Sequence, residues 1–306
     1  MPVHRPAVKR FLDGPLLAPP DLSMVLLVRE DDDTTAGPMP TVAVGEIPHL
    51  VKELSNVGIR SVKVFAGSRL RDSRASQGAS PHGLMMRAIR AAKEADEQIA
   101  VMTETCLCAH TDTGECYLGG VAGVIDMAAT AEAMALQAVA QAEAGADIVG
   151  PAAMMPGTTS AVRAALDDSG HKDVAIMPHL ILDSVLYEGY RTAMGAAPAS
   201  GTRAFQIPAG QSDTAVQAGV GFLDEGADML LLEPAAFTVD TLLRIKAQRP
   251  MPLMPFSVSG EYLRLTRETD DGRDVDPLVE LFTMLKRSGA DRIITYAALD
   301  VARSLG

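Results

Sequence analysis

Three cysteines, the only ones in this chain of 306 residues, lie close together in the pattern C-x-C-x7-C. An apolar run at residues 99–102 precedes them and predicts a strand that leads into a single loop. Thiolates bind zinc strongly, and three protein ligands leave a fourth position for water or substrate, as is typical of catalytic sites. His110 or Asp112 could fill that position, and unrelated buried cysteines are the alternative. The spacing predicts a Zn²⁺ site on three ligands: Cys106, Cys108 and Cys116.

A repeated order of helix, glycine and buried apolar strand must position this loop. The order recurs at residues 142–149, 223–232 and 286–294, and glycine suits the left-handed end of a helix. Eight strands are expected near residues 61–65, 99–104, 147–151, 173–178, 203–207, 229–233, 253–258 and 292–296. This layout predicts an α/β fold, a (βα)8 TIM barrel. An open doubly wound sheet is the alternative, although no glycine-rich dinucleotide fingerprint follows any strand.

The first part of the chain differs in composition from the rest. Residues 1–45 are rich in proline and contain an acidic run at residues 30–33, which favours an extended N-terminal arm. One short strand is expected within it, at residues 24–28. The arm could pack on a neighbouring subunit, or it could be a disordered tail. We therefore expect an arm over residues 1–45 and a barrel catalytic domain over residues 46–306.

Composition limits the partners of the protein. Hydrophobic residues make up 47% of the chain, but no apolar run reaches the roughly 18 residues of a membrane span. The 27 Lys and Arg against 39 Asp and Glu give a net charge of -12, which disfavours nucleic acid. Clustered cysteines suit metal binding in a reducing compartment better than disulfides. We expect a soluble cytoplasmic protein that binds neither nucleic acid nor membrane.

Polar residues gather where the expected strands end, which in a barrel is the active face. Arginine side chains there could hold a small carboxylate substrate, since the guanidinium fork matches a carboxylate. Any one of these arginines, taken alone, could equally be a solvated surface charge. The candidates are Glu104, residues 154–157, His179, Asp183, Tyr187, Arg191, Arg203, Gln206, Glu233, residues 259–262 and Tyr296.

The chain resembles the porphobilinogen synthase (5-aminolevulinate dehydratase) family from about residue 22 to residue 300. The segments that carry the resemblance are the cysteine loop and residues 151–157, 187–191, 225–229, 258–262 and 295–296. The resemblance implies a (βα)8 barrel whose arm clasps a neighbour in a homo-oligomer, from a dimer to an octamer. It also implies that the three cysteines match the catalytic zinc ligands of the family.

The resemblance fails at the residues that carry out the chemistry of the family. Members join two 5-aminolevulinate molecules through Schiff bases on two lysines, and the places of these lysines fall on Ile181 and Glu233. Neither side chain can form an imine with a ketone, so normal porphobilinogen synthesis is expected to be absent or very weak. The residues that hold the substrate carboxylates do match: Arg191, Arg203 and Gln206 for one, Ser259 and Tyr296 for the other.

One lysine could substitute for those that are lost. Lys63 is expected inside an apolar strand, and burial would lower its pKa toward that of a reactive amine. A lysine whose amine reaches the end of the strand is the alternative.

These observations predict a zinc-dependent, lyase-type enzyme that condenses or dehydrates small amino or keto acids without an enzyme Schiff base. Glu233 and Asp183 are the predicted catalytic residues, and apolar neighbours should raise the pKa of Glu233. A salt bridge to an arginine is the alternative role for Glu233. The alternative function is a catalytically silent paralogue that binds a metabolite or regulates an active synthase.

Overall fold

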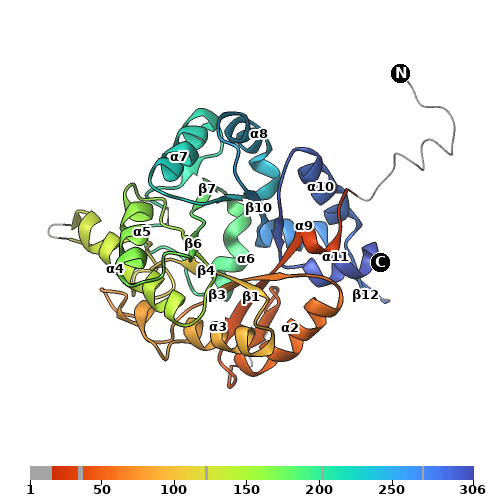
Figure 1. The fold of residues 1–306 in the computed structure, drawn as a ribbon, viewed down its shortest axis with the longest axis horizontal. Helices are drawn as coiled ribbons and strands as arrows, with labels where there is room; N and C mark the ends of the chain where they lie inside the picture. The colour runs from red at the N-terminus through yellow and green to blue at the C-terminus, as the bar shows by residue number, and fades with distance from the viewer. Residues whose placement is uncertain (1–15, 34–36, 121–122, 202, 271) are drawn as a thin grey trace.

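Parallel strands form a ring at the centre of the molecule, and most of the helices surround it, whereas α6 lies over its centre (Figure 1). The structure is a computed structural model that describes residues 16–33, 37–120, 123–201, 203–270 and 272–306. The sheet order is β6-β5-β4-β3-β1-β13-β10-β9-β7-β8. The ring closes because β6 pairs with β5 while β7, which follows it directly in the chain, pairs with β9. The (βα)8 barrel expected from the sequence is confirmed.

The bounds of the elements are as follows. The strands are β1 Leu22–Arg29, β2 Thr41–Ala43, β3 Ser61–Ala66, β4 Ala100–Thr105, β5 Ile148–Pro151, β6 Ala175–Ile176, β7 His179–Asp183, β8 Ile207–Pro208, β9 Leu230–Glu233, β10 Leu253–Ser257, β11 Arg267–Thr269, β12 Gly272–Asp274 and β13 Ile293–Thr295. The α-helices are α2 Ile47–Asn56, α3 Leu84–Ala95, α4 Met127–Glu143, α5 Thr158–Asp168, α6 Glu188–Ala193, α7 Ser212–Asp224, α8 Val239–Gln248, α9 Ser259–Leu265, α10 Asp276–Arg287 and α11 Ala298–Leu305.

Two of the expected strand positions are corrected by the sheet pairing. β1, which the sequence placed in the arm, lies in the ring between β3 and β13. Residues 203–207, expected as the fifth strand, lie outside the ring, and only Ile207 and Pro208 pair there, with the end of β7. The sequence analysis assigned β1 to the arm because a proline-rich loop, and not a helix, directly follows this strand. Residues 1–15 of the predicted arm lie outside the described residues, so its clasp on a neighbour stays a prediction.

A repeated Gly-Ala-Asp sequence marks where a helix ends and the next strand begins. Gly145 ends α4 in the left-handed region, at a φ of +107°, which glycine adopts without strain. Two residues later the Asp147 carboxylate accepts a hydrogen bond of 2.7 Å from the amide of Val101, on neighbouring β4. In the same way, Asp228 accepts from the amide of Ile176 at 2.8 Å, and Asp291 accepts from the amide of Leu253 at 2.9 Å. These carboxylates tie neighbouring strands together at the end of the barrel opposite the cysteine loop.

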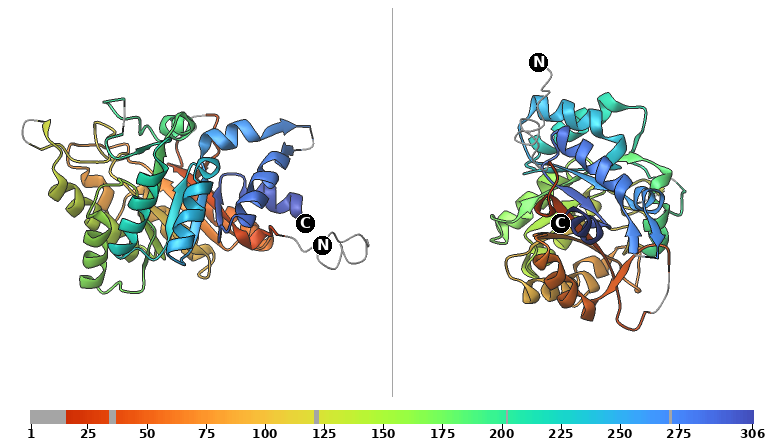
Figure 2. Two further views of the ribbon diagram at one scale, coloured as in Figure 1. Left: turned by 90° about the horizontal axis from the view of Figure 1, so that it is seen from above. Right: turned by 90° about the vertical axis from the view of Figure 1, so that its right-hand side faces the viewer.

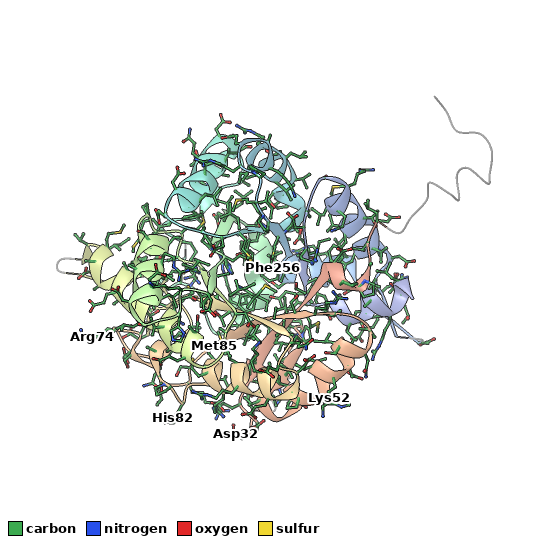
Figure 3. All side chains as sticks on the ribbon, viewed as in Figure 1. Asp32, Lys52, Arg74, His82, Met85 and Phe256 are labelled. Atoms are coloured by element: carbon green, nitrogen blue, oxygen red, sulfur yellow. The ribbon has the colours of Figure 1, made fainter. Side chains whose placement is uncertain are left out.

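The interior of the ring is filled by side chains, as in other barrels of this type. Phe256 lies near its centre, whereas Asp32, Lys52, Arg74 and His82 lie at the periphery (Figure 3). In the side views, the first described residues and α11 lie at the same end of the molecule (Figure 2). No helix within the described residues is both long enough and apolar enough to cross a membrane.

Candidate functional site

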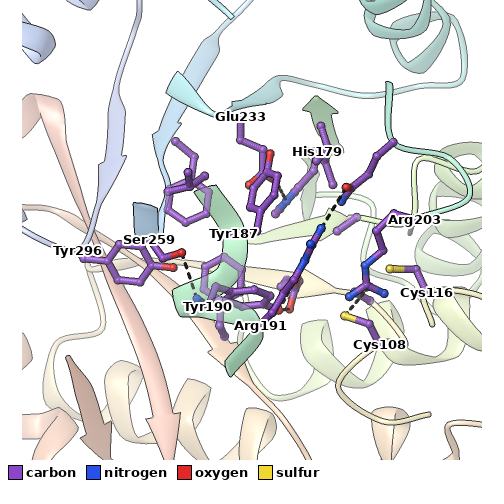
Figure 4. A pocket seen from close by; sticks show the side chains of 18 residues that line it. Cys108, Cys116, His179, Tyr187, Tyr190, Arg191, Arg203, Glu233, Ser259 and Tyr296 are labelled. Carbon is purple, nitrogen blue, oxygen red and sulfur yellow. Dashed lines mark hydrogen bonds and ion pairs between the residues drawn. The ribbon is translucent and has the colours of Figure 1, made fainter. Parts of the chain in front are cut away.

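A cavity of about 50 Å³ opens at the carboxyl ends of the strands (Figure 4). Its lining includes nine of the ten residues predicted as ligands, substrate-binding groups or catalytic groups: Cys106, Cys108, Cys116, Arg191, Arg203, Gln206, Glu233, Ser259 and Tyr296. The tenth, Asp183, is exposed at the end of β7 and does not line the cavity. The structure therefore brings together all of the predicted site except Asp183.

The three cysteine sulfurs converge directly after β4. Their Sγ atoms lie within 4.8 Å of one another, and Cys106 Sγ is 3.3 Å from Cys108 Sγ. Within the described residues, the group of potential ligand atoms that meet at this distance contains neither His110 nor Asp112. The donor set therefore offers three sulfurs on one side of a position that faces the cavity.

The ionisation of these thiols fits a cation-binding site. Hydrogen bonding to the other two sulfurs raises the pKa of Cys106 well above its usual value, with burial adding to the shift. Hydrogen bonds donated by Cys106 and Cys108 lower the pKa of Cys116 well below its usual value. A thiolate so close to two thiols is the arrangement that a bound soft cation stabilises, because it neutralises sulfurs that otherwise share protons. The residues present fit the predicted zinc ion.

Arg203 lies beside the sulfurs but is already held by the backbone. Its guanidinium donates a hydrogen bond of 2.6 Å to the carbonyl of Gly114 and another to the carbonyl of Ala196. Burial lowers the pKa of Arg203, but the charge of the neighbouring cysteines raises it above its usual value overall. Arg203 thus joins the cysteine loop to the segment after α6 and supplies positive charge to the sulfurs.

Arg191 is less constrained and points into the same cavity (Figure 4). Its Nη2 atom lies 3.5 Å from Oε1 of Gln206, which is a long hydrogen bond, and its guanidinium stacks over the ring of Tyr187 at 5.5 Å. Most of its donor capacity is therefore available to an anion.

Ser259 is held by hydrogen bonds to the backbone, whereas Tyr296 is not. Ser259 Oγ donates to the carbonyl of Leu186 at 2.9 Å and accepts from the amide of Tyr190 at 3.1 Å, so it fastens α9 to α6. The buried hydroxyl of Tyr296 has no hydrogen-bond partner among the described residues. A buried donor without a partner is costly, so Tyr296 is the better group to receive a ligand oxygen.

Tyr190 is a site residue that the sequence reasoning missed. Its hydroxyl lies 2.8 and 3.0 Å from the two carboxyl oxygens of Glu104, at the end of β4. Burial raises the pKa of Glu104 to about 8, and the nearby Cys108 adds to the rise. Glu104 and Tyr190 are far apart in sequence, so only the packing of α6 over the barrel mouth reveals their contact.

A second polar group lies deeper in the barrel. Lys63 is fully buried, and its Nζ atom lies 2.7 Å from the carbonyl of Thr103 and 2.8 Å from Nε2 of His179. Nδ1 of His179 lies 2.9 Å from Oε1 of Glu233. Lys63 itself does not line the cavity. The partner of Glu233 is therefore a histidine and not an arginine of the mouth.

Burial shifts the pKa of each of these groups in the direction that favours its uncharged form. Burial lowers the pKa of Lys63 to about 7, and the charges of Glu104 and Glu233 oppose that shift. Burial raises the pKa of Glu233 to about 8, with Glu104 adding to the rise and Lys63 opposing it. Burial also lowers the pKa of His179 well below its usual value. The expectation that apolar surroundings raise the pKa of Glu233 agrees with this direction.

Ile181 provides an apolar wall of the cavity. Its side chain lines the cavity, and its backbone amide lies 3.0 Å from Sδ of Met154. The lining, which consists of described residues, contains two arginines and two glutamates but no lysine. No primary amine is therefore presented to the cavity by these residues.

The chain is similar in sequence to members of one enzyme family. The family model described as delta-aminolevulinic acid dehydratase matches residues 3–304. The chain is 36% identical over 259 residues to the delta-aminolevulinic acid dehydratase of Bacillus subtilis (strain 168), covering 83% of this chain and 80% of that one. It is 33% identical over 305 residues to the enzyme of the same name from Escherichia coli (strain K12), covering 97% and 94%.

A solved structure shows the same relationship in three dimensions. The delta-aminolevulinic acid dehydratase (porphobilinogen synthase) of Toxoplasma gondii ME49, solved with its product porphobilinogen, superposes with a TM-score of 0.89 at 28% identity. The match covers 99% of this chain and 91% of that one. With a family model that spans nearly the whole chain and a cysteine cluster typical of the family zinc site, the chain belongs to the delta-aminolevulinic acid dehydratase family.

Proposed function

We propose that this protein is a zinc-dependent member of the family that acts on small amino or keto acids without forming an enzyme Schiff base. The places of the two family lysines fall on Ile181 and Glu233, so a condensation or dehydration that forms a C–N or C=N bond is the proposed reaction. The observation that carries the proposal is the cavity lining, which combines three sulfurs and two arginines but contains no lysine.

Different residues of the cavity would bind the substrate and transfer the proton. Arg191 would bind the carboxylate of the substrate, because its donors are the least occupied, and Tyr296 would donate to a second oxygen. Glu233 would give or take the proton, since a pKa of about 8 allows both states near neutral pH. A zinc ion on Cys106, Cys108 and Cys116 would supply Lewis acidity toward a carbonyl or amine.

The first test uses 5-aminolevulinate and borohydride. The protein reconstituted with zinc should give no covalent adduct after reduction, as seen by mass spectrometry of the intact chain, because no described amine faces the cavity. The double variant Ile181→Lys/Glu233→Lys should become trappable. Val185→Lys, which adds an amine at a side chain that is 77% exposed and outside the cavity, is the matched control and should not.

Turnover is the second test. The zinc form should convert one member of a panel of amino-keto acids, and chelation should abolish the conversion. An adduct on the unmodified protein at a lysine would overturn the imine-free proposal. Absence of turnover over the whole panel, together with no effect of chelation on any ligand-binding signal, would overturn the enzymatic proposal as a whole.

A catalytically silent subunit is the second candidate function. It is favoured by the absence of a lysine from the described lining of the cavity, because a silent paralogue would lose the groups that carry out the family chemistry. Purification from the native source separates the two candidates. A stoichiometric active synthase that copurifies favours the subunit, and an isolated homo-oligomer with turnover favours the enzyme.

A further inference from the structure

The trio of Lys63, His179 and Glu233 is an unbroken line of hydrogen bonds from the barrel interior to the cavity. The two contacts of His179 measure 2.8 Å to Lys63 Nζ and 2.9 Å to Glu233 Oε1, both of which are within hydrogen-bond range. The three side chains come from β3, β7 and β9 and are all buried. Glu233 and His179 line the cavity, as Tyr296 does, whereas Lys63 at the other end of the line does not.

The space for this line depends on Gly150, on β5. A Cβ atom at this position would lie 2.6 Å from Lys63 Nζ and 3.0 Å from His179 Nε2, distances at which side chains cannot coexist without shifting. It would also lie 2.6 Å from the carbonyl of Thr103, which holds the amine. The missing side chain therefore leaves room for the amine and the imidazole to touch.

We infer that Lys63 and His179 are positioning residues that form a two-proton relay with Glu233 and so set the proton state that Glu233 presents to the cavity. This rests on the proposed role of Glu233 as acid or base. In one state the Lys63 ammonium donates to Nε2 of His179, whose Nδ1–H donates to the Glu233 carboxylate. In the other, the neutral Lys63 amine accepts from Nε2–H, and Nδ1 accepts from the Glu233 carboxylic acid.

The two states contain the same atoms and the same number of protons. Moving from the first to the second breaks an N–H bond on Lys63 and one on Nδ1, and forms an N–H bond on Nε2 and an O–H bond on Glu233. His179 is neutral in both states, which agrees with the lowering of its pKa by burial. The pKa values of Lys63 and Glu233, about 7 and about 8, place the two ends of the relay close in proton affinity.

Other groups face this trio and add to its electrostatic balance. The carboxyl of Glu104 faces Lys63 and Glu233, and its negative charge favours the ammonium and the protonated acid. The remaining titratable groups act on Glu233 or respond to it: Tyr187 beside α6, Glu261 on α9 and Tyr296 after β13. None of these groups lies between His179 and either of its two partners.

The test is the tautomer of His179, measured by ¹⁵N NMR on sedimented full-length protein labelled at histidine. Because the two states contain the same number of protons, pH does not convert one directly into the other. At low pH the Lys63 ammonium donates to Nε2, and at high pH the Glu233 carboxylate accepts from Nδ1–H. The relay therefore predicts that the Nε2–H form is populated only at intermediate pH, between about 5 and about 9, with no imidazolium signal. Lys63→Met should retain the Nε2–H form at low pH, because no ammonium then donates to Nε2. Lys93→Met, which removes a half-buried lysine paired with Asp147 on the outside of the barrel, is the matched control and should behave as the unmodified protein does.

Two further variants keep the inference testable if Lys63→Met does not fold. Glu233→Gln keeps the shape of the side chain but has no acid proton to transfer, and it should fix His179 in one tautomer. Gly150→Ala should displace the amine and have the same effect. A single tautomer across the whole pH range in the unmodified protein, or the same change in Lys63→Met as in the unmodified protein, overturns the relay.

This measurement requires neither substrate nor turnover. A fixed tautomer would therefore remove the relay while leaving the trapping and chelation results untouched. A lysine adduct with 5-aminolevulinate would instead remove the imine-free proposal and leave the tautomer result standing.

Discussion

The hydroxyl of Tyr190 lies within hydrogen-bond distance of both carboxyl oxygens of Glu104, whereas the buried hydroxyl of Tyr296 in the same cavity has no partner among the described residues. Tyr190→Phe should therefore destabilise the protein by about 1–3 kcal/mol, because a buried acid loses its hydrogen bond. Tyr296→Phe removes the same atom at no such cost and should leave the free energy of unfolding nearly unchanged. Urea denaturation of both variants without ligand is the measurement, and equal losses would contradict the distinction.

The geometry of the metal site predicts which residues of the cysteine loop are required for zinc binding and which are not. Replacing Cys106, Cys108 or Cys116 by serine should abolish stoichiometric zinc, because each supplies one of three converging sulfurs. His110→Gln and Asp112→Asn should retain the metal, since neither side chain belongs to the group. Metal analysis after dialysis, with cobalt as an optical probe of sulfur coordination, checks both halves. Loss of zinc in His110→Gln would show that the fourth position is filled by protein.

The two arginines of the cavity should respond differently to replacement. Arg203→Met removes two hydrogen bonds to backbone carbonyls and should cost about 1.5–3 kcal/mol of stability for each of them. Arg191→Met should have a small effect on stability but weaken the binding of levulinate, a carboxylate probe, by about 10-fold to 100-fold. Thermal unfolding and calorimetric titration separate the effects. Unchanged affinity in Arg191→Met would refute its role in binding the carboxylate.

Glu233 should make stability depend on pH in a defined direction. Its pKa is raised from 4.5 to about 8, chiefly by burial, so between these values the folded protein holds a proton that the unfolded chain has released. The stabilisation is complete below 4.5 and is lost as pH rises through about 8. Glu233→Gln cannot titrate, so the stability of the unmodified protein relative to this variant should fall across the window. Parallel profiles from urea denaturation at several pH values would contradict the shift.

Much of the barrel can be predicted from local sequence, because its units are local. The Gly-Ala-Asp repeats mark helix ends and strand starts, and the three aspartates turned out to bind the amides of neighbouring strands. β1 was harder to place, because its membership of the ring depends on pairing with β3 and β13 and on no pattern of its own. Local patterns specify elements, but pairing over long distances specifies which elements close the ring.

In the site, too, local patterns predict some residues, whereas contacts between distant elements cannot be predicted. The cysteines could be predicted as ligands because their spacing is short, and the strand-end rule collected nine of the ten predicted residues. Asp183 also lies at a strand end and, by strand alternation, on the same side as Ile181, but it is exposed beyond the last residue of β7 that reaches the cavity. The contacts between Lys63 and His179 and between Tyr190 and Glu104 join distant elements, so no spacing in the sequence could predict them.

The position of β1 also has a consequence for folding during synthesis on the ribosome. Leu22, at the start of β1, pairs with Ile293 of β13, so one neighbour of β1 is made 271 residues later during synthesis. Until then its apolar residues have an unpaired edge, and closure must wait for contacts of very high sequence separation. Ribosome-bound fragments that stop short of β13 should therefore be prone to aggregate and to recruit chaperones, and fragments that include β13 should be less so.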